Sequence, residues 1–268
     1  PDYSSAASDV YKRQVRTRRG RGLNGEGGHI EPAIALSTTR HKDGVAILKV
    51  FTREHGIIGC LVREGTKGAR RAKHLHAPLS LLHLLRLRTL KGDLHRFDRF
   101  DRPLPQQRTL LEVPRSAVAM FLAEVILRTV EPDAPHPALF DALWRTAEAL
   151  ETEDTFTRLH LAFLVEAVHV QGLQPDAPLV PPPGMGRFNL ATAEWESGPP
   201  IGDDFLSPSD ATAFLRIQGT EIDEVRAQPI PSDVRNRLVL HHVHYLQLHL
   251  SSPKALRSWD VLRTVLAE

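Results

Sequence analysis

Cysteine is nearly absent from this sequence, in which Cys60 is the single one among 268 residues. One thiol excludes an internal disulfide and a cysteine-rich zinc site. No stretch of about 18 apolar residues is present, which excludes a membrane-spanning helix. Aromatic residues make up 6% of the chain, so side chains that could stack on bases are scarce. The P-loop, HExxH and GxSxG motifs are also missing, and with them the main sequence signs of those enzyme classes.

Charge is distributed unevenly along the chain. The formal net charge is +2, yet residues 29–105 hold 15 basic and 7 acidic side chains, while residues 106–268 hold 13 basic and 22 acidic ones. The two parts therefore carry net charges of +8 and −9. A contrast of this size predicts that the basic part meets a polyanion and that the acidic part has another task.

Residues 1–28 do not have the pattern of a folded domain. The stretch SDVYKRQ (8–14) resembles the translated end of a transposon-type sequencing adapter, so we interpret residues 1–28 as an artefact. We expect this segment to be disordered and leave it out of the fold. The alternative is a basic nucleic-acid arm, built on Arg16, Arg18, Arg19 and Arg21.

The basic part, residues 29–105, has the pattern of a small β domain. Short apolar runs rich in β-branched residues alternate with turn signals such as Asp43-Gly44. Five such runs predict a five-stranded OB-type β-barrel, a fold that binds nucleic-acid strands through basic grooves. The runs cover residues 30–39, 44–52, 56–64, 79–90 and 94–103.

The acidic part, residues 106–268, has the apolar spacing of α-helices, and together the two parts predict an α+β chain with an all-α C-terminal domain. Gly172 is expected to end one helix, and Ser207 or Ser209 to cap another. Residues 175–204 are rich in Pro and Gly and predict an irregular insertion with a short hairpin around Phe188 to Trp195. The expected helices cover residues 114–130, 136–151, 155–172, 207–219, 231–250 and 254–268.

Taken together, these segments resemble the DNA repair family RecO, in the form found in Bacteroidetes-like bacteria. The resemblance is carried by STTRHKDGVAILKVFTREHGIIGCLVREGTKGARR in the basic part and by SAVAMFLAEVILRTVEPDAPHPALFDALW in the first helices. The stretch YLQLHLSSPKALRSWDVLRTVL near the end is the most family-like piece. The resemblance covers residues 30–268 and rests on the order and spacing of motifs that are degenerate one by one.

The resemblance implies a protein of recombinational repair without catalytic residues. Such a protein binds single- and double-stranded DNA, anneals complementary strands, and works with RecR and single-strand-binding protein to load the recombinase RecA in the bacterial cytoplasm. Many members carry a four-cysteine zinc site at the level of residues 175–204, where this chain has no cysteine. We therefore expect no metal and no cofactor.

The candidate DNA-binding residues are cations of the basic part. The loop that begins at Arg63 holds five cations in eleven residues, and its glycines allow it to follow a phosphate backbone. Two cations of the first hairpin are second candidates. The alternative is that these cations are ordinary solvated charges on the protein surface and do not bind DNA. The predicted set is Arg40, Lys42, Arg63, Lys67, Arg70, Arg71 and Lys73.

Four further arginines of the basic part, Arg86, Arg88, Arg96 and Arg99, allow two interpretations. They could line an outer face for DNA, or they could pair across strands with Asp98 and Asp101. The nearby aromatic side chains are few, and Phe51 is expected in the core. Contact with the sugar-phosphate backbone is therefore favoured over base readout.

In the family, the helical domain docks the acidic, apolar C-terminal tail of single-strand-binding protein. Such a tail needs an apolar pocket rimmed by cations. Each available cation is explained equally well as a charge on a helix surface. The candidates are Arg115, Arg128, Arg145, Arg158 and Arg187.

Two other functions stay open at this stage. The first is a helical adaptor whose OB domain binds a protein partner instead of DNA. The second is a metal-dependent nuclease that uses His241 and His244, which share one helix face. A histidine face without metal is favoured, because typical sites need three or four convergent ligands. Cys60 is expected to be a small core residue.

Overall fold

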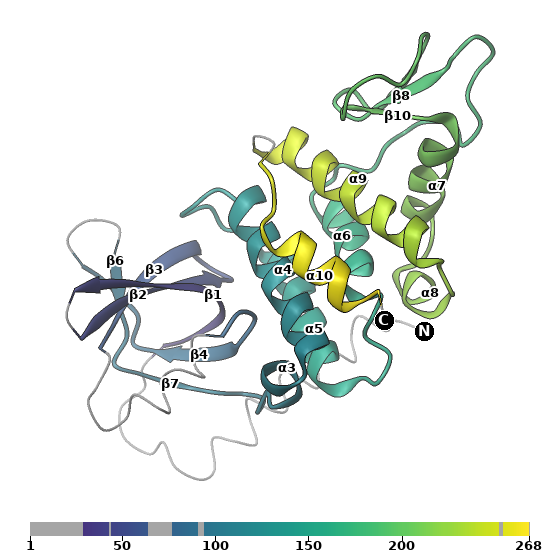
Figure 1. The fold of residues 1–268 in the computed structure, drawn as a ribbon. Helices are drawn as coiled ribbons and strands as arrows, with labels where there is room; N and C mark the ends of the chain where they lie inside the picture. The colour runs from purple at the N-terminus through teal and green to yellow at the C-terminus, as the bar shows by residue number, and fades with distance from the viewer. Residues whose placement is uncertain (1–28, 43, 64–76, 91–93, 252–253, 268) are drawn as a thin grey trace, which may run out of the picture.

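The computed structural model describes residues 29–42, 44–63, 77–90, 94–251 and 254–267. A β-barrel built from the first strands lies against a helical body that holds most of the remaining chain (Figure 1). The predicted α+β class is confirmed. The expected disorder of residues 1–28 falls outside the described residues. Within the described ranges, none of the helices combines the length and the apolar character that a bilayer span requires.

Three long antiparallel strands form the body of the barrel: β1 (Ile30–Lys42), β2 (Val45–Thr52) and β3 (Gly56–Arg63). The pairing of β1 with β2 continues to Lys42 opposite Val45, so two residues connect these strands. Gly44 has a φ of +70°, the left-handed conformation that a tight hairpin requires. The hairpin predicted from Asp43-Gly44 is therefore confirmed.

A second hairpin closes the barrel, and each of its two arms is broken in the middle. The first arm consists of β4 (Leu81–Leu85) and β5 (Arg88–Thr89), and the second of β6 (Leu94–Arg96) and β7 (Arg99–Asp101). β4 pairs with β1 and β7, whereas β6 pairs with β3 and β5. The hairpin thus reaches both edges of the three-stranded sheet and rolls it into a barrel.

The sequence predicts five strands, and the described residues of the barrel form seven. The difference arises because two predicted runs bend. Arg86 separates β4 from β5 and has a φ of +54°, and at this point the chain leaves β1 for β6. A small barrel closes only if its strands tilt and bend. An alternating pattern of apolar residues does not show where such a bend occurs.

The barrel has its own apolar interior, which alternate residues of the strands fill. Cys60 is fully buried there, as predicted, and burial raises the pKa of its thiol to about 12. A thiol in that state is a packing group and not a nucleophile. The fully buried members are Ala33, Ala35, Leu48, Val50, Ile58, Cys60, Leu82 and Leu84.

Eight helices lie in the described part of the body. Most agree with the predicted ranges, but α3 and α8 have no predicted counterpart, because helices of four and six residues are too short to show a period. The helices are α3 (Arg108–Leu111), α4 (Val113–Thr129), α5 (Pro137–Thr152), α6 (Leu159–Val170), α7 (Pro208–Gln218), α8 (Ile222–Ala227), α9 (Ser232–Leu250) and α10 (Ser258–Val265).

The predicted ends of two helices are confirmed. Gly172 follows α6 with a φ of +68°, and Ser207 caps α7 by accepting the backbone N–H of Asp210 at 3.2 Å. Two other predictions were too long. α6 begins at Leu159, four residues after the predicted start, and α10 spans eight residues instead of fifteen.

The insertion at residues 175–204 contains most of a small sheet, whose order is β10–β8–β9. Its strands are β8 (Arg187–Asn189), β9 (Glu194–Glu196) and β10 (Phe205–Leu206), and Phe188 lies opposite Trp195 as the hairpin prediction requires. Two histidines of α9 attach this sheet to the body. Nε2 of His244 lies 2.6 Å from a carboxylate oxygen of Asp204, and Nε2 of His249 lies 2.9 Å from a backbone oxygen of the sheet loop.

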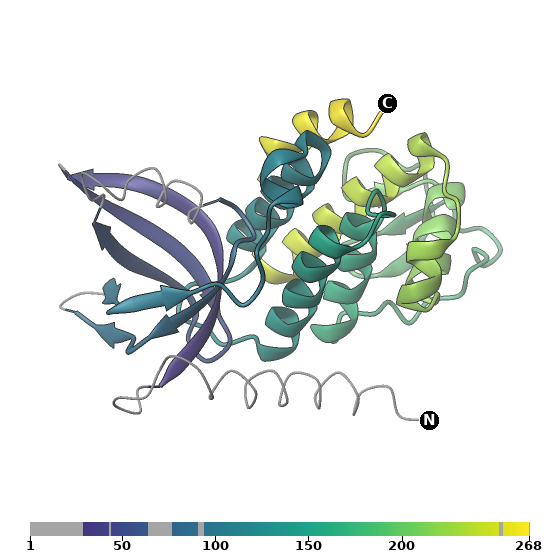
Figure 2. The ribbon, with the colours of Figure 1, turned by 90° about the horizontal axis from the view of Figure 1, so that it is seen from below.

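The barrel lies directly against the helices of the body (Figure 2), and the two parts share one apolar core. Phe51 of β2 is fully buried, as predicted, and its ring meets that of Phe140 of α5 at 5.5 Å. At the turn between β2 and β3, Arg53 forms a two-point ion pair with Asp141 of α5 at 2.9 and 3.0 Å. We call this contact between the barrel and the helical body, formed by Phe51, Arg53, Phe140 and Asp141, the seam. It holds the barrel in a fixed orientation to the helices, because apolar packing and a bidentate ion pair act together.

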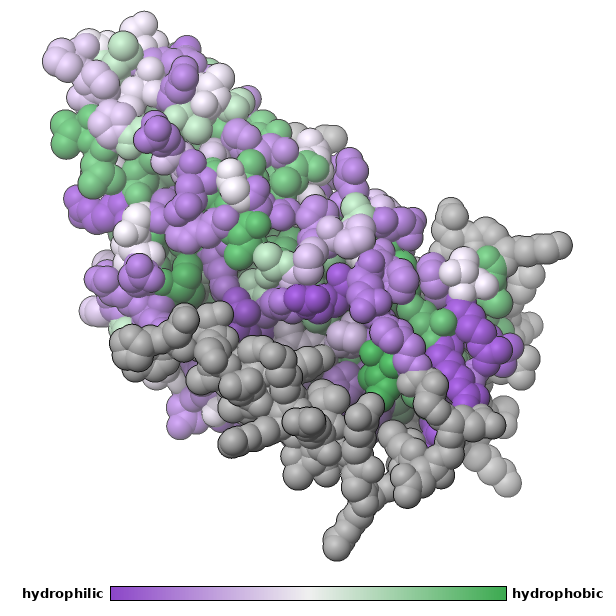
Figure 3. Space-filling model, turned by 180° about the vertical axis from the view of Figure 1, so that it is seen from behind, coloured by the Kyte–Doolittle hydropathy of each residue, from purple (hydrophilic) through white to green (hydrophobic). Residues whose placement is uncertain are grey.

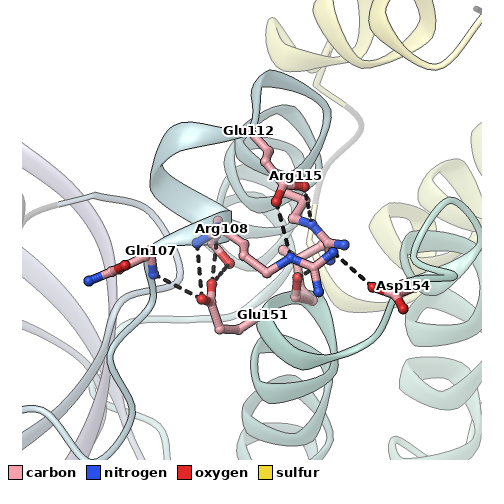
Figure 4. A network of polar contacts seen from close by, with 8 residues as sticks. Gln107, Arg108, Glu112, Arg115, Glu151 and Asp154 are labelled. Atoms are coloured by element: carbon pink, nitrogen blue, oxygen red, sulfur yellow. Dashed lines mark hydrogen bonds and ion pairs between the residues drawn. The ribbon is translucent and has the colours of Figure 1, made fainter.

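Polar side chains fix the link between barrel and body (Figure 4). The carboxylate of Glu151, near the end of α5, accepts the backbone N–H groups of Gln107 and Arg108 at 2.9 and 3.0 Å. Arg108 in turn pairs with Glu112 and Asp154, each at 3.0 Å. The first free N–H groups of α3 are thereby satisfied by a carboxylate from another helix.

Candidate nucleic-acid interface

Strand register brings three of the predicted DNA-binding residues to one end of the barrel. Lys42 lies opposite Val45, and Val45 lies opposite Arg63, so these two cationic residues flank one position of the central strand. Two strand spacings separate them, or about 10 Å between backbones. Arg40 lies opposite Ala46 at the same end and is exposed. We call these three residues, Arg40, Lys42 and Arg63, the cationic end.

The remaining predicted cations continue from this end along the chain. Lys67, Arg70, Arg71 and Lys73 lie in segment 64–76, outside the described residues. In the sequence, that segment follows Arg63 directly. Lys49 is a further exposed cation of β2, which the sequence analysis missed. The sequence could have predicted that Lys49 is exposed, because it lies between the apolar residues Leu48 and Val50 in an alternating strand.

The strand arginines divide into two groups. Arg88 pairs with Asp98 at 2.6 Å, and Arg86 approaches the same carboxylate to 3.7 Å, so the predicted cross-strand pairing with Asp98 is confirmed. Arg96 and Arg99 are exposed and make no ion pair within the described part of the chain. The Asp101 carboxylate accepts the backbone N–H of Arg102 at 2.8 Å instead of an arginine side chain.

Aromatic platforms are absent from the described surface near the cationic end. Phe97 and Phe100 contact each other edge to face at 6.0 Å and pack against the barrel interior. Phe51 is in the shared core. Segment 64–76 contains no Phe, Tyr or Trp. The chemistry at this end is therefore that of cations for phosphates, and not of rings for bases.

The five arginines predicted to receive a partner tail do not converge, and each has an intramolecular partner. Arg115 is 1% exposed, bonds to Glu112 and to the backbone oxygen of Leu150, and lies 4.1 Å from the ring centre of Phe156. We therefore correct its assignment from surface cation to core residue. The other four lie on separate elements: Arg128 pairs with Glu124, Arg145 with Glu166, Arg158 with the backbone of Arg226 and Ala227, and Arg187 with Glu196.

A cavity in the helical body combines apolar walls with a cation that the sequence analysis missed. Its volume is about 420 Å³, and Leu179 and Leu215 contribute apolar surface. Arg216 lines it, is exposed, and has no ion-pair partner within the described ranges. Gln218 also lines it, is 4% exposed, and neither polar atom of its side-chain amide has a protein partner.

The insertion that supplies part of the cavity wall also has exposed apolar side chains. Val180 and Ile201, both in the insertion, are 73% and 71% exposed. Figure 3 shows hydrophobic side chains interspersed with hydrophilic ones over one face of the molecule, some of them toward the end that the small sheet forms. Exposed apolar surface rimmed by a cation is typical of a protein-docking site.

The histidines of α9 hold structure together instead of converging. His242 is fully buried, and burial lowers its pKa to about 3. His244 is bonded to Asp204, and the Nε2 atom of His241 has no hydrogen-bond partner.

Family comparisons agree with the geometry. The profile "Recombination protein O N terminal" matches residues 29–101, and "Recombination protein O C terminal" matches residues 110–177. Together they cover the barrel and the first helices. The chain belongs to the RecO family. The barrel is therefore the RecO N-terminal domain of OB type, and helices α4 to α6 lie within the match to the RecO C-terminal domain.

The chain is also similar to RecO proteins over nearly their whole length. "DNA repair protein RecO" of Flavobacterium psychrophilum is 23% identical over 87% of this chain and 97% of its own length. The protein of the same name from Phocaeicola vulgatus is 26% identical over 86% and 95%, and that from Porphyromonas gingivalis 25% over 88% and 98%. The predicted resemblance to the RecO form of Bacteroidetes is confirmed.

Proposed function

We propose that this protein is a non-catalytic mediator of recombinational DNA repair, whose barrel (29–105) binds single- and double-stranded DNA without sequence preference. The observation that carries the proposal is the cationic end, where two adjacent strand partners of Val45 are Lys42 and Arg63. Cationic residues whose backbones lie about 10 Å apart at one end of a barrel can contact phosphates of the same strand. The sequence continues from Arg63 into four more cations.

Strand annealing follows from this kind of contact. Two complementary strands repel each other through their phosphates, and cations that bind phosphates lower this repulsion. Stacking on aromatic rings would hold the bases away from each other, and Phe97 and Phe100 of the second hairpin are partly buried and packed against the barrel core. A surface that neutralises phosphates and leaves bases free supports pairing of the two strands.

The helical domain (106–268) carries the proposed protein contacts, which are RecR and the acidic, apolar C-terminal tail of single-strand-binding protein. Its net charge of −9 disfavours DNA over most of its surface. For the tail, we replace the five predicted arginines with the cavity at Arg216. A terminal carboxylate would pair with the free guanidinium, and an apolar final residue would lie against Leu179 and Leu215.

The decisive experiment measures annealing of complementary oligonucleotides by fluorescence quenching, with the full chain. We expect faster pairing than in buffer, and loss of most of this acceleration in Arg70→Glu/Arg71→Glu. Annealing no faster than the spontaneous reaction contradicts the proposal. DNA binding that is absent or insensitive to salt, together with a captured protein partner, favours the adaptor function instead.

A further inference from the structure

Three residues from two distant segments meet at the start of the barrel. His29 precedes β1, Glu31 is the second residue of β1, and Glu54 lies in the turn between β2 and β3. One ligand atom from each lies within 4.8 Å of the other two. The two glutamates are 23 residues apart in the sequence, so a short sequence motif could not have predicted the cluster.

The charge of this cluster is unbalanced. Glu31 is 0% exposed, and within the described part of the chain no Lys or Arg side chain pairs with it. One of its oxygens accepts the backbone N–H of Glu54 at 3.2 Å, which leaves the other oxygen facing the imidazole of His29. A cation bound between the two carboxylates would offset the cost of burying one of them beside the other.

The distances fit a metal ion better than a hydrogen-bonded imidazolium. Nε2 of His29 lies 3.4 Å from an oxygen of Glu31 and 3.4 Å from an oxygen of Glu54. A charge-assisted hydrogen bond from nitrogen to carboxylate measures about 2.7–2.9 Å. Two ligand atoms bound to zinc at about 2.1 Å in a tetrahedron lie about 3.4 Å apart.

We propose that His29, Glu31 and Glu54 form a zinc-binding site, with water as the fourth ligand. One nitrogen and two carboxylate oxygens are ligands that zinc accepts. The side chains of His29 and Glu54 are 63% and 57% exposed, so the ion can enter from solvent, whereas buried Glu31 fixes the site from inside. This site is independent of the DNA-binding proposal and differs from the cysteine site expected of the family.

The site has a structural task. Glu54 lies next to Arg53, which pairs with Asp141 of α5, and two residues before Gly56, which contacts the helical body. A bound ion therefore joins the start of β1 to the turn that forms the seam. Ions that bind only the folded state raise its stability by an amount that grows with the logarithm of their free concentration relative to Kd.

The test uses the full chain, stripped of metal with a chelator and titrated with Zn²⁺ by calorimetry. The variants His29→Ala and Glu54→Gln each remove an exposed ligand, and His41→Ala and Glu194→Gln are matched exposed controls. We expect the two ligand variants to bind at this site at least about tenfold more weakly. We also expect the thermal midpoint to rise with zinc in the parent and in the controls, but not in the ligand variants.

Cobalt supplies a second readout, because tetrahedral Co²⁺ has absorption bands that report its geometry. Bands present in the parent and lost in His29→Ala support the site. No binding up to about 100 µM zinc overturns the proposal. Binding that is equal in all variants also overturns it, because the ion is then held by other histidines. Melting in chelator shows that the exposed variants are folded.

Discussion

The carboxylate of Glu151 accepts both the backbone N–H and the hydroxyl of Thr109, each at 2.9 Å. With the N–H groups of Gln107 and Arg108, it satisfies three consecutive donors at the start of α3. The chain passes from barrel to helical body at this place. A single carboxylate on α5 therefore fixes how the linker enters the body.

Replacing Glu151 with Ala should lower the free energy of unfolding by about 2–4 kcal/mol, because three buried or half-buried N–H groups lose their charged acceptor. Urea denaturation measures the change. Asp154→Asn is the matched control, because Asp154 is 93% exposed and pairs only at the surface. An effect of Glu151→Ala no larger than that of Asp154→Asn contradicts the capping role.

Gly56 and Gly172 have nearly the same backbone angle but different surroundings. Their φ values are +70° and +68°, yet a Cβ on Gly56 would lie 2.2 Å from the backbone oxygen of Ala134, whereas one on Gly172 meets nothing within 4 Å. Gly172→Ala should cost about 1–2 kcal/mol for the left-handed conformation alone. Gly56→Ala should cost clearly more, because the seam with the helical body has to open.

Chemical denaturation of the two glycine variants separates the cost of the angle from the cost of the clash. Equal losses of stability would show that the contact between Gly56 and Ala134 does not constrain the seam. A larger loss in Gly56→Ala, with the unfolding slope unchanged, assigns the difference to the contact between barrel and body.

The cationic end makes a quantitative prediction for DNA affinity. Reversing Arg40, Lys42 and Arg63 to Glu should weaken binding to any single-stranded sequence alike, and should reduce the salt slope by about 2, since each phosphate contact contributes about 0.7. Titration of labelled oligonucleotides at several salt concentrations measures both. The control reverses three cations of the helical domain, Lys254, Arg257 and Arg263, which changes net charge equally. A similar effect of both triple variants would show that overall charge, and not this end, binds DNA.

Much of the fold could be predicted because its signals are local. Asp43-Gly44 fixes the first hairpin, and that hairpin fixes the register that places Lys42 beside Val45. The bend at Arg86 could not be predicted, because it depends on barrel closure, which involves β1, β3 and the second hairpin at once.

The site was predicted only in part, for the same reason. Arg115 resembles a surface cation when read alone, yet it lies three and seven residues before Val118 and Leu122, on the buried face of α4. That spacing was a usable signal. For Arg216 the sequence contains no such signal. Its cavity is lined jointly by Arg216 and by Leu179 of the insertion, which are far apart in the sequence.

Two buried histidines should make the fold sensitive to acid. Burial, and to a lesser degree Arg235, lowers the pKa of His160 to about 3, and burial lowers the pKa of His242 to a similar value. The unfolded chain binds these protons near pH 6.5, and the folded chain does not. Stability from these groups is therefore complete above pH 6.5 and falls as the pH is lowered, by about 1.4 kcal/mol per pH unit for each histidine.

Urea denaturation at pH 7 and at pH 5 tests this linkage. In His160→Leu, the loss of stability between the two values should be smaller than in the parent by about 2 kcal/mol. The exposed control His41→Ala should lose as much as the parent. A His160→Leu variant with the parent's pH dependence would show that the buried ring is protonated in the folded state.

The cavity at Arg216 predicts which residue determines capture of a tail. A labelled acidic peptide that ends in an apolar residue with a free carboxylate should bind the full chain, and fluorescence polarisation measures its affinity. Arg216→Ala should weaken binding at least about tenfold, because Arg216 is the cation among the residues that line the cavity and has no ion pair with the described residues. Arg145→Ala is the matched control, since Arg145 is 55% exposed but is already paired with Glu166.

A peptide whose C-terminus is amidated should bind the parent protein as weakly as the peptide with a free carboxylate binds Arg216→Ala. If Arg145→Ala weakens binding and Arg216→Ala does not, the tail binds on α5 and the cavity has another occupant.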